Sequence, residues 1–88
     1  RASHTLVVEV RRFEADYTAG GAPVAQVALA ATLGRASDRH VLAAFTVSAS
    51  EGAAENRQSA VVEALEAAFA RAAGDAAERT FAALNAES

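Results

Sequence analysis

The 88-residue chain contains no cysteine, so it offers no disulfide framework, no thiolate metal site and no nucleophilic thiol. It also contains no lysine, and its arginines are scattered apart from the neighbours Arg11 and Arg12. Binding to a phosphate backbone needs a clustered basic surface, whereas the formal net charge here is −3. No apolar run reaches the roughly 20 residues of a membrane-spanning helix. These absences argue against thiol chemistry and nucleic-acid binding, and direct attention to the protein's surfaces.

The composition is that of a folded globular domain. Hydrophobic residues make up 52% and charged residues 22%, unlike the low-hydrophobicity, high-charge signature of disorder. The length fits residues 1–88 as a single domain with a small core. Much of the apolar content is alanine, which suits close contact between a helix and a sheet better than a thick core. The chain begins at Arg1 rather than Met, a start that fits a processed or trimmed product and leaves room for a targeting segment upstream.

Three segments alternate between apolar and polar residues and predict β-strands. They are His4–Phe13, Val24–Leu33 and His40–Ala49. Between the first two, residues 18–23 include Gly20, Gly21 and the only proline, which is the chemistry of a turn. The three strands therefore predict an antiparallel meander.

Pairing the strands tests whether one face is apolar throughout. We pair Phe13 with Val24, and Leu33 with Val41, because residues opposite each other must share a face. One face then collects the large apolar side chains expected to form the core, among them Val8, Leu29, Phe45 and Val47.

A helix is expected from Asn56 to about Asn85, where apolar residues recur every three or four positions. The expected apolar stripe comprises Val62, Leu65, Phe69, Ala72, Ala76, Phe81 and Leu84. Gly74 inside the segment suggests a kink or a break. The helix polar face lacks the basic excess of a membrane-surface helix, so we expect packing against the sheet. The predicted fold is α/β of the α+β kind, a three-stranded antiparallel meander with a long C-terminal helix on one face.

The residues suited to chemistry do not converge on a predicted site. His4 and His40 lie at strand starts and are expected to be neighbours, but two histidines without a clear carboxylate make a poor metal site. Glu63 and Glu66 fit a solvated helix face. The two glycines do not precede a helix, so a phosphate cradle is not expected. We therefore predict no enzyme activity, no catalytic residues, no metal and no cofactor.

The second face of the predicted sheet carries the candidate interaction residues. They are Val7, Phe13, Val24 and Leu42, set among polar neighbours. An uncovered face and an unpaired edge strand invite burial by another chain, so we expect a homo-oligomer or a protein partner. The alternative is that these four side chains are scattered on a monomer without consequence.

Several segments resemble one known family. The run from Val8 to Tyr17, VEVRRFEADY, contains the step Arg12-Phe13-Glu14, and the second strand ends in Leu33-Gly34-Arg35. The helix contains VVEALEAAFARA from Val61 to Ala72. On these residues the chain is similar to the ABC-type transport auxiliary lipoprotein component family, which includes the paraquat-inducible protein C-like lipoproteins. The similarity spans most of the chain, although its motifs are made of common residues without a catalytic anchor.

The resemblance implies the C-terminal portion of a larger auxiliary-component domain. It implies a non-enzymatic scaffold that works beside an ABC transporter and mammalian-cell-entry-type proteins in envelope transport of lipid or solvent. The location implied is periplasmic, with a lipoprotein anchor that this chain does not contain. The leading alternative is a small periplasmic protein that binds a lipid or another hydrophobic ligand between helix and sheet. An enzyme and an unrelated interaction domain are the remaining hypotheses.

Overall fold

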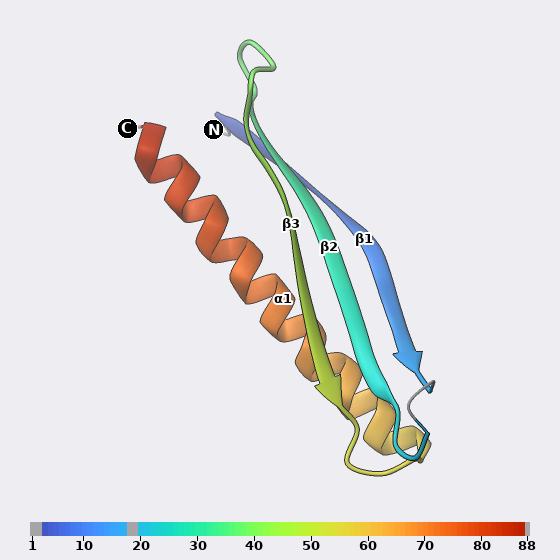
Figure 1. Ribbon diagram of the computed structural model, residues 1–88. Coiled ribbons are helices and arrows are strands. Elements are labelled where there is room, and N and C mark those ends of the chain that lie inside the picture. Colours follow the sequence, from blue (N-terminus) through green and yellow to red (C-terminus); the bar gives the residue numbers. More distant parts are fainter. Residues whose placement is uncertain (1–2, 18–19, 88) are drawn as a thin grey trace.

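A computed structural model describes residues 3–17 and 20–87 of the chain. Its elements are β1 (His4–Asp16), β2 (Val24–Arg35), β3 (Val41–Gly52) and α1 (Gln58–Glu87). The strands form one antiparallel sheet in the order β1-β2-β3, and α1 runs along one face of it (Figure 1). The molecule is elongated, with extents of 50 × 20 × 17 Å. The predicted α+β meander with a C-terminal helix is confirmed.

The pairing of β1 with β2 differs from the predicted register. Phe13 lies opposite Val27, whereas the sequence analysis paired it with Val24. Before the bulge the pairing is already shifted by two residues, with Val10 opposite Leu29 instead of Val27, and this shift keeps each side chain on its predicted face. A β-bulge that leaves Arg11 as an extra residue on β1 adds the third residue to the shift. Since side chains alternate between faces, one extra residue reverses the face of every later side chain compared with an unbroken strand. Phe13 therefore lies on the helix side of the sheet, and its predicted place on the opposite face is wrong.

The pairing of β2 with β3 is also shifted. Leu33 lies opposite Ala43 instead of Val41, and a second bulge follows at Gly34, where Leu42 is the extra residue. The shift relative to the predicted register amounts to two residues, which preserves the alternation. Ala43, Phe45 and Val47 therefore still share one face with the apolar residues of β2, as predicted. Val41 lies beyond the bulge opposite Gly34, so its predicted place on that face is wrong.

The turn between β1 and β2 requires glycine. Gly20 and Gly21 have φ angles of 76° and 67°, in the left-handed region that residues with a Cβ disfavour. The Gly20 N–H donates to the Tyr17 carbonyl at 3.2 Å. The predicted turn is present here, although residues 18 and 19 of that prediction lie outside the described residues.

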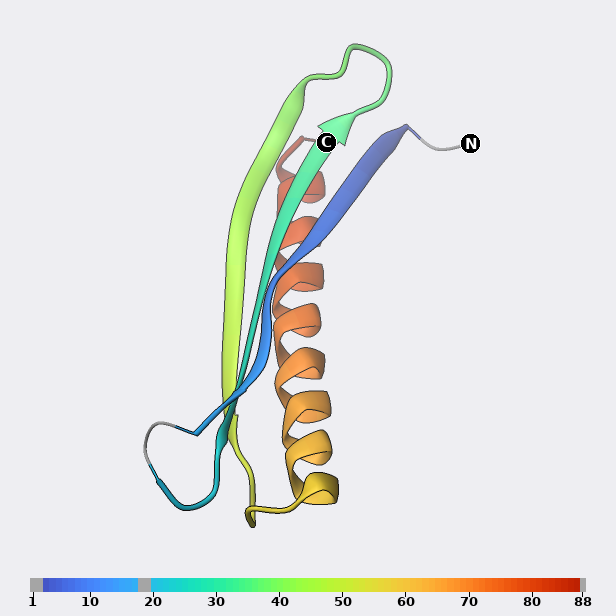
Figure 2. The ribbon, with the colours of Figure 1, turned by 90° about the vertical axis from the view of Figure 1, so that its right-hand side faces the viewer.

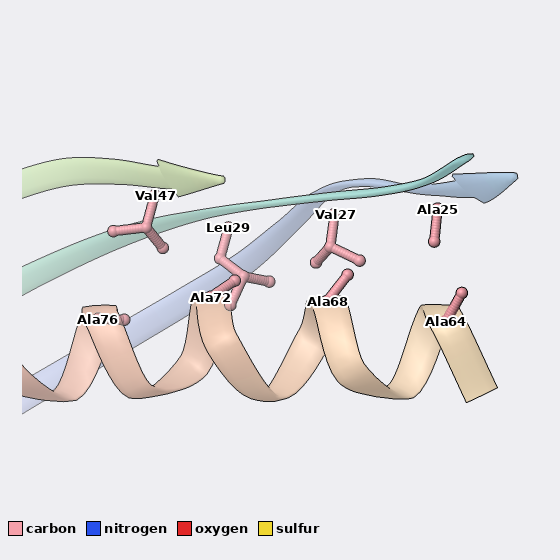
Figure 3. Close-up of a cluster of buried hydrophobic side chains, with 8 residues drawn as sticks. All are labelled: Ala25, Val27, Leu29, Val47, Ala64, Ala68, Ala72 and Ala76. Carbon is pink, nitrogen blue, oxygen red and sulfur yellow. The ribbon is translucent and has the colours of Figure 1, made fainter. Parts of the chain in front are cut away.

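The core is a line of alanines on α1 facing β2 and β3. Ala64, Ala68, Ala72 and Ala76 pack against Ala25, Val27, Leu29 and Val47 (Figure 3). Residues four apart lie on one side of a helix, so the small side chains form a continuous ridge. Ala60 and Thr80 extend this ridge at either end, and the Thr80 hydroxyl donates to the Ala76 carbonyl at 2.8 Å. Each alanine removes only one carbon from water, so the depth of the core comes from β2.

The large apolar residues of α1 are not its buried ones. Val62 and Phe69, expected in the stripe that packs on the sheet, are 45% and 41% exposed. Close approach of helix and sheet favours side chains that end at Cβ, and the larger ones are placed beside the contact. On the sheet, Leu29 and Val47 are buried as predicted, but Phe45 is only partly buried. Of the predicted stripe, Ala72 and Ala76 are buried as expected, whereas Val62, Phe69 and Phe81 are exposed.

α1 is continuous through Gly74, so the suggested kink is absent. It starts two residues later and ends two residues later than predicted. The helix of 30 residues spans about 45 Å at 1.5 Å per residue, which matches the strands it follows (Figure 2).

Candidate interaction surface

One helix covers only two of the three strands. α1 packs on β2 and β3 and has few contacts with β1. A helix with its side chains is about 10 Å wide, and neighbouring strands lie about 4.8 Å apart, so the third strand is out of reach. In Figure 1, the label-bearing part of β1 is the part of the sheet farthest from α1. The helix side of β1 is therefore open to solvent along most of its length.

The open side of β1 is apolar. Its side chains alternate toward the helix side before the bulge and again after it. They are 45–54% exposed. We call these residues the β1 apolar strip: Leu6, Val8, Val10 and Phe13. Four large apolar side chains in a row, each about half exposed, form a contiguous patch of the kind that marks an interaction site.

The helix flank that faces this strip is apolar too. The Phe69 ring meets the Phe13 ring edge-on, with centroids 6.3 Å apart and planes at 74°. Both rings, together with Glu66, line an open apolar recess of about 330 Å³. Phe69 belongs to a second ridge, whose members each follow a residue of the buried ridge. We call this ridge the apolar flank of α1: Val61, Leu65, Phe69, Ala73, Ala77 and Phe81.

The opposite flank of α1 is charged and closes over β3. The Arg71 guanidinium pairs with Glu51 at 2.7 Å and also donates to the Ser50 carbonyl. Arg79 lies over the Phe45 ring, 5.8 Å from its centroid. These arginines connect this flank of α1 to side chains of β3 and to the Ser50 backbone carbonyl.

The four predicted interaction residues do not form one surface. Phe13 lies on the helix side, while Val7 is 59% exposed on the other face, opposite Thr32. Val24 lies eight residues from Thr32 along β2, roughly 27 Å away. Leu42 sits in the bulge of β3 and is partly buried. Of the four, only Phe13 joins the apolar surface that the structure assembles.

The far face of β1 carries two ion pairs in addition to Val7. Glu9 pairs with Arg11 at 3.1 Å, and Arg12 pairs with Glu14 at 3.0 Å. Each of these side chains is more than half exposed. Exposed ion pairs contribute little stability, about 0–1 kcal/mol, so their role is to set charge along the strand.

The two histidines lie near one end of the sheet, as expected. His4 is opposite Arg35, whose backbone N–H donates to the His40 carbonyl at 2.8 Å. Asp38 accepts hydrogen bonds from the His40 N–H and from the Arg35 guanidinium, both at 3.1 Å. These contacts, the backbone N–H foremost, hold the pKa of the Asp38 carboxyl below its ordinary value. The arrangement stabilises the turn between β2 and β3.

Across residues 3–17 and 20–87, no three His, Asp or Glu side chains gather as metal ligands would. Within the same ranges, the helix is not long and apolar enough to cross a membrane. Glu66 borders the apolar recess, and Glu55 pairs with Arg57 at 3.4 Å on the surface.

Comparisons with known proteins place the fold. No family model and no curated protein matches the chain. Among solved structures, it is similar to a Xanthomonas campestris protein described under the family model DUF330, with 28% identity over 98% of this chain and a TM-score of 0.92. It is also similar to a candidate lipoprotein from Caulobacter crescentus, with 20% identity over 96% of this chain and a TM-score of 0.61.

The chain spans 50% of the length of the Xanthomonas protein and 64% of the Caulobacter protein. The meander and its helix are therefore an arrangement that larger proteins contain. The structural neighbours are a DUF330 protein and a candidate lipoprotein, and the second likeness concerns the fold alone.

Sequence reasoning missed the β1 apolar strip as a surface. It assigned Val8 to the core because the residue alternates correctly, without asking how many strands one helix can cover. Comparing the width of a helix with the spacing of three strands was the signal that would have found the strip.

Proposed function

We propose that the protein is a non-enzymatic auxiliary component of an ABC-type envelope transport system, acting by binding other proteins. The observation that carries the proposal is the uncovered apolar surface formed by the β1 apolar strip and Phe69. A surface of this size and composition suits a protein partner. No reaction, metal or cofactor is assigned to the chain.

One likeness supports the transport context, and another supports the lipid anchor. The sequence segments around Phe13 and Arg35 resemble the auxiliary lipoprotein family, and one of the solved neighbours is described as a candidate lipoprotein. On this proposal the protein works in the periplasm, held to a membrane by a lipid anchor outside residues 1–88. Its partners are the mammalian-cell-entry-type proteins and the permease of such a system.

The proposal is tested by reconstitution with defined partners. A permease, an ATPase and a mammalian-cell-entry-type protein of such a system from the same organism are co-expressed with the full-length protein, and the complex is isolated. Phe69→Asp is expected to weaken the complex at least about tenfold, as loss of a central aromatic anchor does. Val7→Asp, on the far face, is the matched control and is expected to leave the complex intact. A complex that fails to form, or that tolerates Phe69→Asp, contradicts the proposal.

The apolar recess favours a second candidate, binding of a lipid or other hydrophobic ligand. Its volume of about 330 Å³ lies at the lower end of the range for small-molecule sites, and two of its three lining residues are phenylalanines. Native mass spectrometry of the protein mixed with phospholipid tests this candidate. A bound lipid that is lost in Phe13→Asp would favour ligand binding, whereas an empty protein would favour the protein-partner role.

A further inference from the structure

The two edges of the sheet are treated differently by the rest of the molecule. On β3, Arg71 of α1 pairs with Glu51 and donates to the Ser50 carbonyl, and Arg79 lies over the Phe45 ring. The edge formed by β1, a strand of 13 residues, has no element of the described chain beside it. A long edge strand presents backbone donors and acceptors that another strand can pair with.

The bulge gives β1 an unusual symmetry. Before it, the even-numbered residues face the helix side, and after it the odd-numbered residues do. A strand that pairs with its own copy around a two-fold axis places residues i and j opposite each other at a constant sum. A residue before the bulge and a residue after it lie on the same face only when one number is even and the other is odd. The sum of the two residue numbers must therefore be odd.

A sum of 21 matches both faces of the strand. On the helix side, Val8 lies opposite Phe13 of the second copy. On the far side, Glu9 lies opposite Arg12. The two bulge residues, Val10 and Arg11, lie at the two-fold axis, where a bulge interrupts regular pairing in any case.

Charge selects this register over its neighbours. With a sum of 21, each copy contributes one Glu9 opposite one Arg12, so two attractive pairs form across the axis. Moving the register to a sum of 23 places Glu9 opposite Glu14, and like charges directly opposite each other are destabilising. A sum of 19 places Glu9 opposite Val10 and Arg12 opposite Val7, so no attractive charge pair forms across the axis.

The existing ion pairs extend into the second copy in this arrangement. Glu9 pairs with Arg11, and Arg12 with Glu14, within one chain. Contact between Glu9 and the second copy's Arg12 joins these pairs into one alternating row of charges. On the helix side, the β1 apolar strips of the two copies become a single apolar floor, with α1 of each copy along its margins.

We propose that two copies of the protein pair their β1 strands antiparallel, with Glu9 of each opposite Arg12 of the other, and form a continuous six-stranded sheet. The pairing rests on the β1 edge alone and stands whether or not the transport proposal does.

Charge reversal with rescue tests the pairing. The chain of residues 1–88 is analysed by multi-angle light scattering at about 100 μM, where a micromolar complex is populated. The wild type is expected to be dimeric. Arg12→Glu and Glu9→Arg each place like charges opposite each other twice, and each is expected to dissociate the dimer at least about tenfold more readily.

Mixing the two single variants is the decisive step. A pair made of one Arg12→Glu chain and one Glu9→Arg chain restores both attractive contacts, so the mixture is expected to recover the dimer. Arg57→Glu, an exposed reversal outside β1, is the matched control and is expected to remain dimeric. Circular dichroism checks that every variant keeps its helix.

A wild type that is monomeric at this concentration overturns the proposal and leaves the β1 edge to a different partner. A dimer that survives both single reversals, or a mixture that stays monomeric after both have dissociated, overturns the register.

Discussion

The two flanks of α1 meet the sheet in opposite ways. Toward β3, Arg71 and Arg79 reach over the sheet and make polar and cation–π contacts. Toward β1, the apolar flank of α1 faces the β1 apolar strip, and the Phe69 ring contacts the Phe13 ring. The same helix therefore packs on one edge strand and leaves the helix side of the other open to solvent.

The difference shows how a small α+β unit divides its apolar residues. The closed side is stabilised by tight alanine contacts and needs nothing further from solvent or partner. On α1 the exposed apolar side chains are larger than the buried ones. The buried ridge is mostly alanine, whereas the apolar flank carries two phenylalanines. Apolar residues of this size in water are a feature of binding surfaces rather than of stability.

The largest expected difference between the two sides is in the free energy of unfolding. Leu33 and Leu6 lie opposite each other on the same face, yet they are 2% and 45% exposed. Leu33→Ala is expected to cost about 2–5 kcal/mol, because it leaves a cavity under α1. Leu6→Ala is expected to cost about 1 kcal/mol or less, since about half of its side chain is already in water.

Urea denaturation followed by circular dichroism measures both leucine variants, at low micromolar protein so that association contributes little. Equal losses for the two would mean that the helix side of β1 is covered in solution, and the comparison between the open and closed sides would fail.

Overpacking the alanine ridge is expected to have a smaller effect. Ala68 is fully buried against the sheet, so Ala68→Leu forces α1 away from β2 and is expected to cost about 1–3 kcal/mol. Ala70→Leu, two residues along on an exposed part of the helix, is expected to change stability by less than about 0.5 kcal/mol. Thermal unfolding compares the two variants, and a tolerated leucine at position 68 would show that the helix does not rely on close approach.

The smallest expected effect concerns the charged flank. Arg79 is about half exposed, and its contact with the Phe45 ring is expected to contribute about 0.5–1 kcal/mol. Arg79→Gln should lower stability by that amount in the wild type and by less in a Phe45→Leu background. Arg57→Gln is the control away from the sheet. An identical loss in both backgrounds would show that the Phe45 ring does not contribute to the effect of Arg79, and the contrast between the two flanks would be weaker.

The sequence carried much of the fold because its patterns are local. Alternation in β2 named Val27, Leu29 and Leu33 as core residues, and all three are buried. Gly20 and Gly21 marked the first turn through a backbone requirement that glycine meets best. Patterns of this kind depend on neighbouring residues and need no knowledge of the third dimension.

The candidate surface was less accessible to the same reasoning. The expected interaction face included Phe13, because alternation alone places this residue on the face of the sheet away from the helix. The extra residue at Arg11 reverses that placement, and nothing in the local pattern marks the bulge. The predicted helix stripe included Ala72 and Ala76, which are buried, but also Val62, Phe69 and Phe81, which are exposed because close packing on a sheet selects the smallest side chains.

By itself the sequence determined three strands, one helix, their antiparallel order and an apolar side of the sheet, because hydrophobic period and turn chemistry are written residue by residue. Only the tertiary structure decided which side of the helix is buried and which strand is left uncovered. The physical reason is geometric. A helix about 10 Å wide covers two strands and leaves β1 uncovered, and a single extra residue in β1 turns Phe13 to the helix side of that uncovered strand.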